Sequence, residues 1–445
     1  MAVKFFNAFR RAAVSVSIVL ITLLFEAPSF LLSQAEPQEI EPLSCNLPTI
    51  SVQPRHALRD PDWRNLDDRK GPRRATYLKL SELSIENLNY FSFTSIAFSP
   101  DGQFITSGVK YDTYRKKPSG QTFLGVPVEA DSNGWVVVWS NLYAKGKDWI
   151  ASRLYTSSRE INTVAFNRTG REQFLAAGGN DRAFVGVWEK TRWSSRREVK
   201  PNQQSTNQLL SVKTIVFSPD GQMLSIGGLQ NLTGSKLGIR RWDLRGGELR
   251  PPRSALEEIR EEQLTGRTRK QEVHAIAFSP DSKIIAAGGR ALSLRREQKV
   301  STLENFRPFI HLWNAKTGKY LCGLPNLGSS SIASIAFSPD GTMLASTDSS
   351  GTIKLWSIPT LKLLWSVDQQ GSTIAFSPSS DLLLSGGKNV KLWQVRTGKL
   401  IKTYERNGEG KPLFLNPVIA VAFRPDGQAF AAANQNLIQL FMPSN

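Results

Sequence analysis

A short motif, IAFSPDG at residues 96–102, recurs along the chain and constrains its fold more than any other feature. Six variants follow it: VAFNRTG (164–170), IVFSPDG (215–221), IAFSPDS (276–282), IAFSPDG (335–341), IAFSPSS (374–380) and VAFRPDG (421–427). The first letters of each copy alternate as in a strand that is apolar on both faces, so we expect both faces to be buried. The last letters predict a tight turn, because proline presets φ, aspartate bonds nearby backbone and glycine accepts left-handed geometry.

Further strands complete each unit. A strand of small residues follows each motif, and the next strand ends in tryptophan in six of the seven copies. Several copies then show a turn and a fourth strand, as in WQVRTGKLIKTY, and the shortest period, from Phe337 to Phe376, is 39 residues. A period near 40 with four antiparallel strands per unit is the signature of a propeller blade. We therefore predict an all-β fold, a seven-bladed β-propeller over residues 75–445.

The last copy ends directly after its third strand. An incomplete blade would leave a row of unpaired backbone groups along its edge. The segment ATYLKLSEL (75–83) precedes the first blade and alternates as a strand does. We expect this N-terminal strand to complete the seventh blade.

The repeated units resemble those of the WD-repeat β-propellers, in particular a bacterial type whose repeats read AFSPDG, IKLW and TGK. The resemblance implies a non-enzymatic scaffold that binds a protein or an anionic ligand. The chain departs from the family pattern: Trp242-Asp243 is its one Trp-Asp pair among the repeats, the upstream Gly-His pair is missing, and Asn133 and Ser350 replace the turn aspartate. We therefore expect the family's buried hydrogen-bond network to be absent and apolar packing between blades to hold the fold.

The N-terminal residues predict export. Lys4, Arg10 and Arg11 precede an apolar run over residues 12–25, and a small-residue stretch (SQA) follows, which is typical of a secretory signal over residues 1–35. The run is shorter than the about 20 residues of a spanning helix, although an uncleaved membrane anchor over residues 12–25 stays open. We predict an exported protein, periplasmic or extracellular.

A polar, proline-bearing segment over residues 36–74 predicts a flexible linker. It contains Cys45, and the other cysteine, Cys322, falls in an expected outer strand. An exported protein could pair the two, but their spacing does not require it.

The formal net charge of +18 indicates an anionic partner or surface. We expect a protein partner, with an anionic envelope polymer or a membrane surface as alternatives. Nucleic acid would suit the charge but is disfavoured by export.

Two insertions between second and third strands single out one face of the fold. They are VKYDTYRKKPSGQTFLGVPVEADSNG (109–134) in the first blade and RALSLRREQKVSTLENFRP (290–308) in the fourth. The longest connection between blades, residues 249–271, opens on the same face. The overlapping segment 253–272 has the spacing of a short amphipathic helix. Cations beside aromatic residues suit an anionic or extended ligand. The alternative is that the insertions are solvated, mobile loops.

Ten residues of the two insertions are our candidate binding residues, which we call the basic rim. They are Lys110, Tyr111, Tyr114, Arg115, Lys116, Lys117, Arg290, Arg295, Arg296 and Lys299.

Catalytic patterns are missing from the sequence. The three histidines, His56, His274 and His311, stand in no HExxH motif, no Cys-His cluster and near no GxSxG serine. We predict no catalytic residue, no metal and no cofactor. Two alternatives stay open: a propeller of the Tol translocation type, which shares SPDG turns, and a propeller hydrolase or lyase, whose site would need converging carboxylates.

Overall fold

The computed structural model describes residues 47–48, 76–79 and, with gaps, 91–442. The gaps are residues 112–121, 124–125, 128–133, 141–150, 168–172, 181–182, 190–191, 199–208, 231–238, 246–247, 251–268, 298–299, 369–370, 406–411 and 415. The chain divides into two compact units, Met1–Leu43 and Ser44–Asn445, and every described residue belongs to the second. The predicted signal or anchor therefore lies outside the described residues. Among those that are described, no helix is long and apolar enough to cross a membrane.

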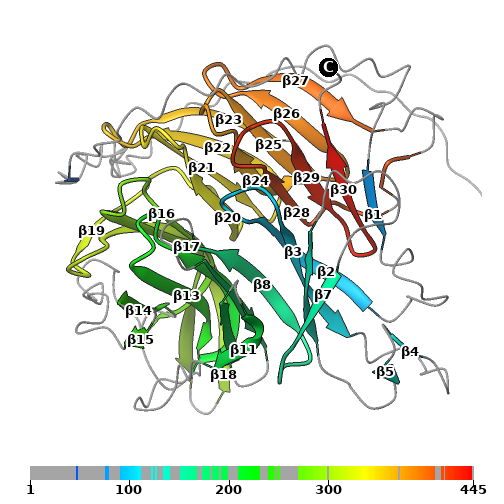
Figure 1. The fold of residues 1–445 in the computed structure, drawn as a ribbon. Helices are drawn as coiled ribbons and strands as arrows, with labels where there is room; N and C mark the ends of the chain where they lie inside the picture. The colour runs from blue at the N-terminus through cyan, green and yellow to red at the C-terminus, as the bar shows by residue number, and fades with distance from the viewer. Residues whose placement is uncertain are drawn as a thin grey trace, which may run out of the picture. The chain divides into compact units, whose positions relative to one another are not determined.

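The described strands form seven four-stranded antiparallel sheets, numbered here in chain order (Figure 1). Sheet 1 contains β2 (Phe91–Phe98), β3 (Ile105–Tyr111), β6 (Trp135–Trp139) and β7 (Ala151–Tyr155). Sheet 2 contains β8 (Ile161–Phe166), β9 (Phe174–Gly179), β10 (Val185–Glu189) and β11 (Arg192–Glu198). Sheet 3 contains β12 (Leu209–Phe217), β13 (Met223–Gln230), β14 (Ile239–Arg245) and β15 (Glu248–Arg250).

The remaining sheets follow the same order of first to fourth strand. Sheet 4 contains β16 (Arg269–Phe278), β17 (Ile284–Glu297), β18 (Val300–Asn314) and β19 (Tyr320–Gly323). Sheet 5 contains β20 (Ile332–Phe337), β21 (Met343–Asp348), β22 (Thr352–Ser357) and β23 (Leu363–Asp368). Sheet 6 contains β24 (Gly371–Phe376), β25 (Leu382–Gly387), β26 (Val390–Gln394) and β27 (Lys399–Tyr404).

Sheet 7 takes its fourth strand from the other end of the sequence. It contains β28 (Ala420–Phe423), β29 (Phe430–Ala433) and β30 (Leu437–Phe441), and β1 (Thr76–Lys79) pairs antiparallel with β30 (Figure 1). A separate two-stranded hairpin, β4 (Thr122–Phe123) and β5 (Val126–Pro127), lies within the first insertion. The first strands also contact one another in sequence, from β2 with β8 through to β24 with β28, and β28 contacts β2.

The recurring turn has the geometry that its letters predict. In the first copy Gly102 adopts φ of 67°, Ser99 is fully buried, and its hydroxyl donates to Asp101 and accepts from the amide of Phe104. These local bonds satisfy polar groups that the turn would otherwise bury without partners.

Two copies have serine where the others have glycine. Ser282 and Ser380 adopt φ of 60° and 68° there. Their hydroxyls accept the amides of Asp220 and Asp340 in the turns of the preceding sheets, at 3.0 and 3.1 Å. The substitution thus adds a hydrogen bond between neighbouring sheets in place of glycine's freedom.

The core is built from the alternating residues of the motif and from the tryptophans. Ile96 and Phe98 are each 9% exposed, and Trp139, which ends the third strand, is 2% exposed. Our expectation that both faces of the first strand are buried is wrong for the face of Ala97, because Ala97 and the residues at its position in the other six sheets are only half-buried. A small side chain on this face lets the first strands lie close together without filling the space beside them.

In sheets 1–4 and 6, a glycine near the end of the second strand meets an apolar side chain of the next sheet, a contact that we call the seam. A Cβ atom at Gly178 would lie 2.4 Å from Val212 Cγ1, and one at Gly288 would lie 2.8 Å from Ile332 Cγ2. The close approach of the sheets therefore requires glycine at these positions. The same contact recurs between Gly108 and Ile161, Gly227 and Val273, and Gly386 and Val418.

Between sheets 5 and 6 the larger residue is on the second strand and the glycine is on the next first strand. The register puts Thr347, which is fully buried, where sheets 1–4 and 6 have the seam glycine, and puts Gly371 where the other sheets have the apolar residue. A Cβ atom at Gly371 would lie 3.4 Å from Ser385 Cβ and 3.7 Å from Ile353 Cδ1, at ordinary contact distance, so Gly371 is less crowded than the seam glycines.

We predict that Gly178→Thr destabilises the protein by about 2–3 kcal/mol, because the added side chain overpacks the seam against Val212. Val212→Gly should also destabilise it, through lost burial. The double variant reproduces the exchange of sheets 5 and 6, so its loss should be smaller than the sum of the two single losses by at least about 1 kcal/mol. Urea unfolding of the four proteins measures this coupling, and additive losses would contradict the seam.

Candidate functional site

The basic rim is only partly within the described residues. Lys110 and Tyr111 end β3, and Lys110 forms an isolated bridge with Glu160 at the start of sheet 2. Arg290 lies in β17 with its side chain described, and the backbones of Arg295 and Arg296 pair with Thr302 and Ser301. The rest of the rim, Tyr114, Arg115, Lys116, Lys117 and Lys299, lies outside the described residues. The described parts of the rim lie in β3 and in β17, and their assembly into one rim stays a prediction.

The second insertion is a strand pair where we expected a loop. Residues 290–308 continue β17 and β18 as a ladder that runs from Arg290 opposite Pro308 to Glu297 opposite Val300. Ladder hydrogen bonds satisfy the backbone within the insertion, so the alternative of a mobile loop is wrong for this segment. We call residues 290–308 the arm.

The prediction of a helix over residues 253–272 is wrong for its last four residues. Residues 269–272 belong to β16 and pair with Ser293 to Arg290 of the arm. Cross-strand pairing with the arm outweighs the weak helical spacing here. Residues 253–268 lie outside the described residues.

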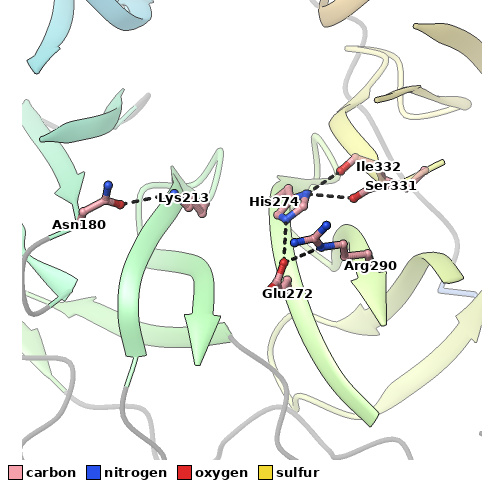
Figure 2. Close-up of polar contacts among 7 residues, drawn as sticks. All are labelled: Asn180, Lys213, Glu272, His274, Arg290, Ser331 and Ile332. Atoms are coloured by element: carbon pink, nitrogen blue, oxygen red, sulfur yellow. Dashed lines mark hydrogen bonds and ion pairs between the residues drawn. The ribbon is translucent and has the colours of Figure 1, made fainter. Parts of the chain in front are cut away.

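A polar cluster lies where β16 enters sheet 4 (Figure 2). Arg290 Nε donates to Glu272 Oε2 at 2.6 Å, across a directly paired position of β16 and β17. His274 Nε2 lies 3.6 Å from the same carboxylate oxygen. On its other side, His274 Nδ1 lies 3.2 Å from the Ile332 carbonyl oxygen and 3.1 Å from Ser331 Oγ of sheet 5. The cluster therefore links the arm, the first strand of sheet 4 and the next sheet.

Burial governs the protonation of His274. Removal of the imidazole from water lowers its pKa below the ordinary value of 6.5. The hydrogen bond to the Ile332 carbonyl and the Glu272 charge raise the pKa, and the Arg290 charge lowers it, but burial is the largest effect. His274 is therefore neutral at pH 7, with one N–H. Both ring nitrogens face oxygen atoms: Nδ1 faces the Ile332 carbonyl oxygen and Ser331 Oγ, and Nε2 faces Glu272 Oε2.

Ser331, His274 and Glu272 lie in the order of a hydrolase triad, in which a histidine nitrogen must accept the serine proton. His274 Nδ1 is 3.1 Å from Ser331 Oγ and also 3.2 Å from the Ile332 carbonyl oxygen, which only accepts hydrogen bonds. Among the described residues, no group of three or more His, Cys, Asp or Glu side chains could hold a metal ion. What the described contacts do is join sheet 4 to the start of sheet 5.

Equivalent residues make the same bond on other sheets. Each follows the apolar seam residue of its own first strand, a place that we call the seam polar position, and bonds the carbonyl oxygen of the next sheet's seam residue. The bonds are Thr94 to Ile161 (2.5 Å), Asn162 to Val212 (2.6 Å) and Ser372 to Val418 (3.5 Å). In sheet 3 the position holds the exposed Lys213, whose Nζ lies 3.4 Å from Asn180 Oδ1 (Figure 2). Sheets 5 and 7 have Ala333 and Ile419.

Our reading of the sequence missed the seam polar position and Glu272. An alignment of the seven copies on their phenylalanine would have found the seam polar position. The position always lies four residues before the phenylalanine, and from sheet 1 to sheet 7 it holds Thr, Asn, Lys, His, Ala, Ser and Ile. A position that varies within a regular repeat is a candidate for binding. Glu272 carries no such signal, since only the register of the arm brings it to Arg290.

His311 has a different environment, inside sheet 4. Its ring lies 4.9 to 5.8 Å from those of Phe309, Trp313 and Tyr320, and its Nδ1 is buried without a hydrogen-bond partner. Burial lowers its pKa to about 4. A neutral imidazole among aromatic rings is a packing group.

Comparisons with known proteins point to one repeat family. The family model "WD domain, G-beta repeat" matches residues 89–114, 260–293 and 324–357, which fall on sheets 1, 4 and 5. The chain is similar to periodic tryptophan protein 2 homolog of Dictyostelium discoideum, with 25% identity over 62% of this chain and 26% of the relative.

Shorter stretches are similar to two other proteins. Human apoptotic protease-activating factor 1 is 32% identical over 18% of this chain and 8% of the relative. Small ribosomal subunit protein RACK1 of Schizosaccharomyces pombe is 27% identical over 25% of this chain and 37% of the relative. The chain thus spans well under half the length of each of these relatives. All three are eukaryotic, so they lend no support to the bacterial type of repeat.

We predict that the free energy of unfolding falls by about 2 kcal/mol between pH 7.5 and pH 5, because unfolded His311 takes up a proton near pH 6.5 and folded His311 does so only near pH 4. The unfolded state binds more protons in this window, so acid favours it. His311→Phe should remove most of this fall, and His274 contributes a smaller fall of the same sign. Urea unfolding across the pH range measures both proteins, and equal pH dependence would contradict the assignment.

Proposed function

Because three segments of this chain are WD40 repeats, we propose that its seven sheets are the blades of one closed propeller, which acts as a non-enzymatic scaffold for a protein partner. Repeats of this family typically serve protein interaction. The successive contacts of the first strands, the contact of β28 with β2 and the pairing of β1 with β30 support closure. One relative, RACK1, is itself named as a ribosomal subunit protein, which fits a role within an assembly.

The binding face is the one that carries the seam polar positions. Sheets 1 to 4 have polar residues there, Thr94, Asn162, Lys213 and His274, whereas two of the other three sheets have Ala333 and Ile419. This asymmetry is the observation that carries the proposal, because sheets 1 and 4, which bear the two insertions, are among the sheets with a polar residue at this position. Lys213 is exposed and the Arg290 side chain is 39% exposed. A partner segment with acidic residues complements Lys213 and Arg290.

We also propose export, on the basis of the charged and apolar N-terminal residues. Cys322 is disulfide-bonded, which fits an oxidising compartment. The mass of the mature chain tests removal of residues 1–35.

The rim is tested by replacing Arg115, Lys116 and Lys117 together with alanine. We expect capture of the partner from extract to fall about tenfold at low salt, since each rim charge is worth up to about 1 kcal/mol. The matched control replaces three exposed cations of sheets 5 and 6, Lys362, Arg396 and Lys399. Quantitative mass spectrometry of the captured protein is the measurement, and equal loss in both triple variants would contradict the rim.

Closure is tested by deleting residues 75–86. We expect a large fall in the melting temperature, because β30 would lose its ladder partner and present an unpaired edge. Deletion of residues 50–61, a segment of equal length that contains no described strand, is the control. An unchanged melting temperature for the first deletion would contradict closure by β1.

A further inference from the structure

Cys322 has a partner that its surroundings identify. It lies in β19, is 4% exposed and is disulfide-bonded. The sequence contains one other cysteine, Cys45, which lies outside the described residues. The compact unit that contains Cys322 begins at Ser44, so both cysteines belong to it.

The described residue Leu47 supports the same pairing independently. Its side chain packs against the apolar cluster that contains Cys322, Leu324 and Ile332, at the junction of sheets 4 and 5. Two residues of extended chain span at most about 7 Å, so Cys45 cannot be far from this cluster. A disulfide needs Cα atoms about 4.4–6.8 Å apart, which this placement permits.

We propose that Cys45 and Cys322 form a disulfide that staples the N-terminal segment around Leu47 to sheets 4 and 5. Each thiol loses its proton, the two sulfurs form one bond, and two electrons pass to an external disulfide, which is reduced to two thiols. That oxidant is a thiol–disulfide oxidoreductase or an oxidised small thiol. The segment from Pro48 to β1 then has to reach sheet 7, for which its 28 residues, about 90 Å when extended, are sufficient.

A cleft of about 450 Å³ lies at the base of the arm. Arg307 and Pro308 line it from β18, and Leu324 and Leu327 line it from the connection to sheet 5. Leu324 and Leu327 also pack in the apolar cluster that contains Cys322 and receives Leu47.

Peptide mapping of the full chain, purified without reductant, tests the bond. Trypsin should leave the peptide that ends at Arg55 joined to the peptide of residues 320–354, and a reductant should separate them. Recovery of both cysteines as free thiols, or of a bond between the Cys322 residues of two chains, would overturn the proposal.

Thermal melting tests the staple itself. We expect Cys45→Ser to melt about 5 °C below the oxidised wild type, because the bond closes a very long loop. Reductant should lower the wild type to the same temperature and leave Cys45→Ser unchanged, whereas Asn46→Ser, which keeps both cysteines, should respond as the wild type does. Equal melting of oxidised wild type and Cys45→Ser would overturn the staple.

Discussion

The seam between neighbouring sheets is the contact on which this structure depends. A four-stranded sheet of this size cannot bury both of its apolar faces alone, so each sheet needs its neighbours. The seam sets how close they come, because the glycine of one second strand leaves room for only one branched side chain from the next first strand. Between sheets 5 and 6 the register puts Thr347 and Gly371 at these two positions instead.

The same place in the first strand separates the frame from the site. The register shifts beside the apolar seam residue, as between Val212 and Thr214 and between Val273 and Ala275, so a bulge puts one extra residue there. A β-bulge redirects a side chain without breaking the sheet. The residue after the seam residue can therefore change from threonine to lysine to histidine while the frame stays constant. This is how a regular repeat can carry an irregular binding face.

The repeats made the strands and turns predictable, but the insertions were harder to interpret. The repeated letters correctly predicted the strands, including third strands that end in tryptophan, and the left-handed turn position, because these depend on residues close in sequence. The arm was expected to be a loop, since its length and charge obscure its alternation. The pairing of Glu272 with Arg290 depends on the register of that arm, and register is set by hydrogen bonds between strands that the sequence does not reveal.

By itself the sequence determined the repeated unit, its strands, its turn chemistry and the small residues at the ends of the second strands. Only the tertiary structure decided which residues of different repeats meet: Gly178 with Val212, His274 with Ile332, β1 with β30. The physical reason is the range of the interactions. Propensity and turn geometry act over a few residues, whereas packing density and backbone pairing act between segments that become neighbours only when the sheets have assembled.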